Sequence, residues 1–152
     1  MKKQGALKKV KPIIFAEYKI KLVAEVKTNT DISKRDHFDH ENKTWERHLD
    51  FFKQENSYLK TRLSVVIDSN DDKELIKLGE YFQNQFLLKD EFIRGLKVDI
   101  NRQTDDIRNN KNGSVSKDVI DRQEKLRKQI SYFETDFSRL KTEFNQVITQ
   151  FL

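Results

Sequence analysis

The residue types best suited to metal chemistry gather in one short segment. All three histidines of the chain, His37, His40 and His48, lie there with Glu41 among them. On a helix, spacings of three and four residues put His37, His40 and Glu41 on one face, where they could hold Zn, Fe or Mn. Hemerythrin-like and di-metal bundles, however, take histidines from several helices, and the rest of this chain has none. A solvated charge cluster without a cofactor is therefore our main interpretation, and a metal-binding bundle is the alternative.

A second set of polar residues recurs at intervals of seven. Glu41, His48 and Glu55 would form a line beside the apolar face of one helix. Residues at such positions commonly make ion pairs between helices. We expect them to pair with Arg94 or with the last helix rather than to perform acid/base catalysis.

The basic residues are concentrated at the N-terminus. Residues 1–35 contain ten Lys and Arg against Glu17, Glu25 and Asp31, a charge of +7, so the remainder carries −2 of the total of +5. Such an arm could bind the phosphates of nucleic acid or another anion, and the candidate residues are Lys8, Lys9, Lys11, Lys19 and Lys21. The other interpretation is a solubilising extension. It is favoured because the first 34 residues contain no arginine, the residue best suited to bidentate phosphate contacts.

Several functional classes lack their signatures. There is no cysteine, so thiolate zinc sites and cysteine nucleophiles are excluded. A phosphate-binding glycine loop is also missing, and a filled heptad core leaves little room for a substrate. We therefore predict a protein that is not an enzyme. The longest apolar run, residues 13–16, is far shorter than the ~20 residues that span a bilayer, which predicts a cytoplasmic protein without a transmembrane segment.

The elements that carry these residues are predicted to be three long helices, at 34–68, 71–109 and 116–151. Hydrophobic and charged residues each make up 36% of the chain, and there are only four Gly and one Pro. Apolar residues recur at alternating spacings of three and four, most regularly in the last helix, where Phe133, Phe137 and Phe144 lie on the seam. Near-equal lengths predict an all-α, antiparallel three-helix bundle or coiled coil.

Folding the chain near residue 71 gives an expected register. It brings Asn56 beside Gln85 and Phe86, and Trp45 beside Gly95 and Leu96. Polar residues would then face each other, and a glycine would face the largest side chain. Some apolar residues remain outside this seam, which predicts a homo-oligomer or partner helices that cover them; they are Ile76, Leu88 and Ile148. The function expected from this arrangement is structural: a protein-interaction bundle that associates with itself.

The first 33 residues form a separate basic arm in this scheme, with a conformation that the sequence leaves open. Residues 18–27 alternate apolar and polar side chains, which is typical of a strand. Alternatively, Pro12 could begin a short helix with Ile13, Glu17 and Ile20 on one side. The strand would need a partner from another subunit, because the chain offers no second strand.

Three segments carry a resemblance to known sequences: HENKTW at residues 40–45, FQNQFLLKDEFI at 82–93 and DINRQ at 99–103. Together they resemble a group of small uncharacterised bacterial helical proteins with a His-Glu-x-x-x-Trp start and an FQNQF middle. The resemblance covers about residues 36–108. It implies a cytoplasmic coiled-coil bundle with no known activity, and it transfers no functional residues.

Overall fold

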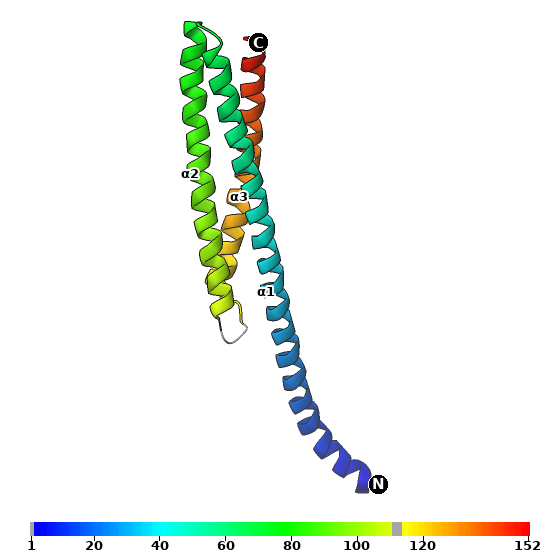
Figure 1. Ribbon diagram of the computed structural model, residues 1–152. Coiled ribbons are helices and arrows are strands. Elements are labelled where there is room, and N and C mark those ends of the chain that lie inside the picture. Colours follow the sequence, from blue (N-terminus) through cyan, green and yellow to red (C-terminus); the bar gives the residue numbers. More distant parts are fainter. Residues whose placement is uncertain (1, 111–113) are drawn as a thin grey trace.

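The chain forms three helices packed side by side, as Figure 1 shows for the computed structural model. The structure describes the backbone of residues 2–110 and 114–152, and the side chains of residues 33–110 and 114–152. The helices are α1 (Lys2–Asp68), α2 (Lys73–Asn109) and α3 (Lys117–Thr149). Helix α2 runs antiparallel to α1, and α3 returns beside both (Figure 1). The prediction of an all-α three-helix bundle is confirmed.

The N-terminal ends of α2 and α3 are set by capping side chains. Ser116 accepts a hydrogen bond from the backbone N–H of Val119 at 3.2 Å, which confirms the expected start of the third helix. Helix α2 begins at Lys73, two residues later than predicted, because Asp72 is its N-cap. The Asp72 Oδ1 accepts from the N–H groups of Glu74 at 2.8 Å and Leu75 at 3.4 Å.

The core follows the predicted heptad seam along the whole bundle. Trp45, Phe133, Phe137 and Phe144 are all buried, Phe144 completely. Phe144 meets Phe82 and Phe86 edge to face, with ring centroids 5.3 and 5.2 Å apart, a geometry that adds to the burial of apolar area. Ile76 and Leu88 are exposed as expected, but the prediction for Ile148 was wrong. Ile148 is 1% exposed and belongs to the core cluster.

The two glycines of α2 have opposite environments. Gly95 was predicted to face Trp45, which is wrong: Gly95 is exposed, and a Cβ placed on it would have nothing within 4 Å. Ile93 and Leu96 occupy the seam there and turn Gly95 outward. Gly79 instead lies buried in the seam, where an added Cβ would come within 2.5 Å of the Cδ1 atom of Ile67. The close approach of α1 and α2 therefore occurs at Gly79, near the connection between these helices.

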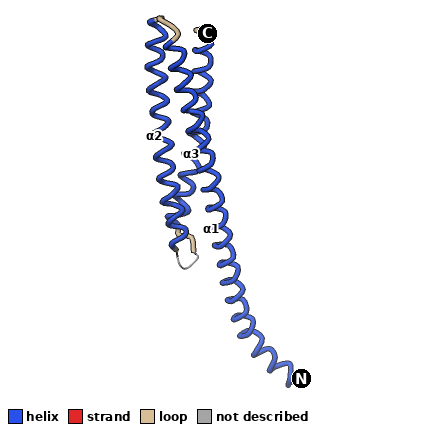
Figure 2. The backbone as a smooth tube through the Cα atoms, in the orientation of Figure 1, coloured by secondary structure: helices blue, strands red, loops and turns tan. Residues whose placement is uncertain are grey.

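The N-terminal arm is helical and continuous with α1. The alternative of a strand over residues 18–27 was wrong, and neither a new helix at residue 34 nor one beginning at Pro12 is present. Extending an existing helix by one residue adds a hydrogen bond without a new nucleation step, and this favours continuation over a separate element. The first half of α1 projects beyond the ends of α2 and α3 (Figures 1 and 2). No helix in residues 2–110 and 114–152 has the length and apolarity needed to cross a bilayer.

Candidate functional site

A buried polar layer joins the three helices near the end of the bundle where α2 connects to α3. Gln123 Nε2 on α3 donates to Asn42 Oδ1 at 2.8 Å and to Glu41 Oε1 at 2.9 Å, both on α1. Asn42 Nδ2 donates to Thr104 Oγ1 of α2 at 3.1 Å, and Gln103 Nε2 donates to Gln123 Oε1 at 3.1 Å. Asn42, Gln103 and Gln123 are each at most 1% exposed. Since polar groups this deep need partners, the layer fixes how the helices align.

Glu41, one of the predicted metal ligands, is held by this layer and by Arg127. Arg127 donates through Nε to Oε2 at 2.9 Å and through Nη2 to Oε1 at 2.8 Å, a bidentate arrangement with geometric specificity. Burial alone would raise the pKa of Glu41. The hydrogen bonds from Arg127 and Gln123, together with the charge of Arg127, outweigh it and hold that pKa below its ordinary value. Glu41 is therefore an ionised structural carboxylate.

The three histidines lie at the surface and are not drawn together with Glu41 into a ligand set. His37 and His40 are exposed. His48 is also exposed, and its Nδ1 lies 3.4 Å from Glu134 Oε1. Within the side chains of residues 33–110 and 114–152, no group of three or more His, Asp and Glu residues could hold a metal ion. Metal binding by His37, His40 and Glu41 stays a prediction.

The line of Glu41, His48 and Glu55 forms a ladder of contacts with α3. Pairing with the last helix was one of the two predicted alternatives. The partners also recur every seven residues, so α1 and α3 run parallel. The three pairs are Glu41 with Arg127, His48 with Glu134, and Glu55 with Lys141. The other predicted partner, Arg94, is not used. Charged residues flanking a heptad seam set the orientation and register of neighbouring helices, and this ladder does so on the α1–α3 side.

Asn56 provides a second polar contact inside the core, between α1 and α2. Its Nδ2 donates to the carbonyl oxygen of Phe86 at 2.8 Å and to Asp90 Oδ1 at 2.7 Å. Asp90 also accepts from Lys60 Nζ at 2.5 Å. Phe86 was a predicted neighbour of Asn56, but the second polar partner is Asp90 and not Gln85, which lies half-buried. The Oδ1 atom of Asn56 is buried without a hydrogen-bond partner.

The outer face of α1 carries an apolar line, which we name the α1 stripe. It consists of Phe51, Tyr58 and Val65, which are 58%, 63% and 59% exposed. The spacing of seven keeps them on one line of the helix, next to the ladder that faces α3. This stripe was not among the predicted features, although its signal, a second apolar repeat of seven outside the main seam, is present in the sequence.

The candidate phosphate-binding residues Lys8, Lys9, Lys11, Lys19 and Lys21 lie outside the residues whose side chains the structure describes. Only the helical path of their backbone is given. Comparisons with protein-family models, curated proteins and solved structures gave no match to the chain. A functional assignment therefore has to come from the surfaces and contacts described above.

Proposed function

We propose that this chain is a structural, protein-interaction bundle that associates with a second copy of itself through the α1 stripe. The observation that carries the proposal is the exposure of Phe51, Tyr58 and Val65 along a single line of α1. Soluble monomers rarely align large apolar side chains in this way without a partner. A second helix laid along the stripe would cover all three residues at once.

The arrangement of the stripe supports a second copy as the partner. Phe51 and Val65 lie at equal sequence distances from Tyr58. Two antiparallel copies of α1 crossing at Tyr58 would therefore place Tyr58 against its own copy and the larger Phe51 against the smaller Val65. Such a contact is isologous, because each copy contributes the same surface.

The expected strength of this contact follows from the exposed area. Full burial of a large apolar side chain contributes about 1.5–3 kcal/mol, so covering the exposed part of each stripe residue contributes roughly 1–2 kcal/mol. Six such residues, three from each copy, would give about 6–12 kcal/mol. Association costs about 4–15 kcal/mol in lost freedom. The balance predicts a concentration-dependent dimer and not a permanent one.

Sedimentation equilibrium over a range of protein concentrations tests the proposal. We expect Tyr58→Ser to weaken dimerisation strongly. Tyr132→Ser is the matched control, because Tyr132 on α3 is 64% exposed and Tyr58 is 63% exposed. A monomer at every concentration, or an equal effect of both substitutions, would contradict the proposal.

Crosslinking gives a second, geometric test. The chain contains no cysteine, so Tyr58→Cys introduces one thiol at the expected crossing point. Under mild oxidation this variant should form a disulfide-linked dimer faster than Tyr132→Cys does. Equal rates for the two variants would show that the copies do not meet at Tyr58.

A further inference from the structure

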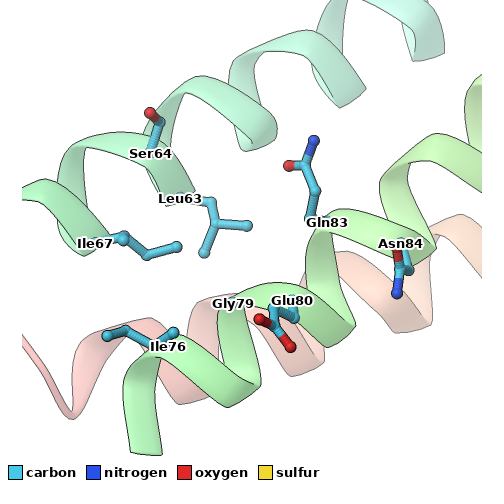
Figure 3. Close-up of a pocket in the computed structure, with 8 residues that line it drawn as sticks. All are labelled: Leu63, Ser64, Ile67, Ile76, Gly79, Glu80, Gln83 and Asn84. Carbon is cyan, nitrogen blue, oxygen red and sulfur yellow. The ribbon is translucent and has the colours of Figure 1, made fainter. Parts of the chain in front are cut away.

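A hollow of about 560 Å³ lies between α1 and α2 near their connection. Figure 3 shows Leu63 and Ile67 from α1 and Ile76 from α2 around it, with Gly79 opposite the α1 side chains and Glu80 at the edge. Ile76 is 44% exposed. Because Gly79 has no side chain, the two helices approach closely beneath the hollow and leave an open apolar recess above it. We call this recess the tip pocket.

The segment around the tip pocket is acidic. Residues 68–80, the hairpin tip, contain five carboxylates against Lys73 and Lys77, a net charge of −3; the carboxylates are Asp68, Asp71, Asp72, Glu74 and Glu80. Asp72 is occupied in capping α2. Within the described side chains, none of the five makes an ion pair with a Lys, Arg or His. An apolar recess with an acidic rim suits a basic segment that also carries apolar residues.

The arm has this composition. Residues 1–33 contain eight Lys against Glu17, Glu25 and Asp31, a net charge of +5, and apolar residues are interleaved with the lysines between positions 7 and 15. The arm continues α1 away from the bundle and is covered by neither α2 nor α3 (Figures 1 and 2). A partner docked on the arm would add contacts that α2 and α3 of the same chain do not supply (Figure 1).

The arm cannot reach the tip pocket of its own chain. Residues 33 and 67 both lie on the continuous helix α1, and at ~1.5 Å per residue they are about 50 Å apart. The arm leaves the bundle at the end opposite the hairpin tip (Figure 1). Only the arm of a different molecule can enter the tip pocket.

We infer that the arm of one copy docks in the tip pocket of another, with lysines against the acidic rim and apolar side chains in the recess. This contact goes beyond the self-association proposed above, because it uses surfaces separate from the α1 stripe. It is heterologous, because each copy offers a different surface at each end. Copies joined in this way form a ring or an open row, and the contact weakens as salt screens the charges.

A charge-swap experiment in full-length Tyr58→Ser protein tests this contact apart from the α1 stripe. In one variant, the arm-reversed chain, three positive charges of the arm are replaced by negative ones through Lys8→Glu, Lys9→Glu and Lys11→Glu. In the other variant, the tip-reversed chain, three negative charges of the hairpin tip are replaced by positive ones through Asp71→Lys, Glu74→Lys and Glu80→Lys. Asp72 is left in place because it caps α2. Sedimentation at low salt should show association of the Tyr58→Ser parent weakened roughly tenfold to hundredfold in each variant alone, and restored when the two variants are mixed.

The apolar part of the contact has its own matched pair. Ile76→Ser should weaken association, whereas Leu87→Ser should not, because Leu87 is 47% exposed on the same helix but does not line the tip pocket. Circular dichroism confirms that both variants remain folded.

Two results would overturn the inference. One is a mixture of arm-reversed and tip-reversed chains that stays as dissociated as either variant alone. The other is a parent chain that remains monomeric at low salt but binds a short DNA duplex. If the variant with reversed arm charges no longer binds that duplex, the arm would be assigned to nucleic acid. In either case dimerisation through the α1 stripe, measured in the chain that retains Tyr58, would be unaffected.

Discussion

Replacing Glu41 with Gln isolates the charge that joins the polar layer to α3. The substitution keeps the size of the side chain and an acceptor oxygen for Gln123, but it removes the negative charge that Arg127 contacts with two hydrogen bonds. We expect Glu41→Gln to lower the free energy of unfolding at neutral pH. The protein should stay folded, because the apolar seam is untouched.

The size of this loss follows from how far the pair is buried. The side chain of Glu41 is 16% exposed and that of Arg127 is 46% exposed. Fully exposed pairs contribute about 0–1 kcal/mol, and breaking a fully buried pair costs about 3–5 kcal/mol. Because Arg127 is partly screened by solvent, the expected loss lies near the lower range, at about 1–2 kcal/mol.

The stability that Glu41 contributes depends on pH in a direction set by its lowered pKa. The pKa of Glu41 lies below its ordinary value of 4.5 in the folded chain, so its contribution is complete above that value and is lost as pH falls through the folded pKa. Urea unfolding from pH 7 to pH 3 should therefore show the difference between wild type and Glu41→Gln shrinking below about pH 4.5. Asp39, whose pKa is also lowered, titrates in both proteins and cancels in the difference.

Glu91→Gln serves as the control, because Glu91 is exposed on α2 and has no ion-pair partner among the described side chains. It should leave stability nearly unchanged at every pH. A gap between wild type and Glu41→Gln that stays constant from pH 7 to pH 3, or a gap no larger than that of Glu91→Gln, would refute the assignment of Glu41 as an ionised structural partner of Arg127.

The remaining predictions concern packing and capping, and all are measured by chemical unfolding. Gly95→Ala should stabilise the chain by up to about 1 kcal/mol, since the position is open and helical; Gly79→Ala should lack that gain, because its Cβ would displace the end of Ile67. Ser116→Ala should cost about 1 kcal/mol through the lost cap of α3. Asn56→Ala should cost roughly 2–4 kcal/mol, because it removes a buried hydrogen bond to the Phe86 carbonyl and a partly buried one to the charged Asp90. Unchanged unfolding midpoints for Gly95→Ala, Ser116→Ala or Asn56→Ala, or a gain in stability for Gly79→Ala equal to that of Gly95→Ala, would contradict these predictions.

The seam was predictable because helical periodicity is a property of the local sequence. Trp45, Phe133, Phe137 and Phe144 fall on it without reference to any neighbour, and all are buried. The side to which Gly95 turns is different. It depends on how each helix is rotated about its own axis against its neighbours. A repeat of seven fixes this rotation only to within about one residue position. The same uncertainty explains why Ile148, one residue beside the seam, was placed outside the core.

The polar contacts were only partly predictable, for a related reason. The spacing of seven predicted interhelical pairs for Glu41, His48 and Glu55, and the partners proved to lie on α3. The identity of Asp90 as the partner of Asn56 required a register accurate to one helical turn, since Gln85 and Asp90 are only five residues apart. The arm shows the limit of local patterns, because alternation over ten residues suggested a strand where the longer helix continues.

The polar layer and Asn56 together make the α1 stripe a defined surface. A pure apolar heptad seam could shift by seven residues and still bury its side chains. After such a shift Gln123 would meet His48 and Leu49 in place of Glu41 and Asn42, and Asn56 would lose Asp90. Each buried polar group left without a partner costs about 1–3 kcal/mol, so the shifted bundle is disfavoured at two places along its length. The bundle therefore holds α1 in one position against α2 and α3, and that support keeps Phe51, Tyr58 and Val65 aligned on its outer face, as the proposed contact with a second copy requires.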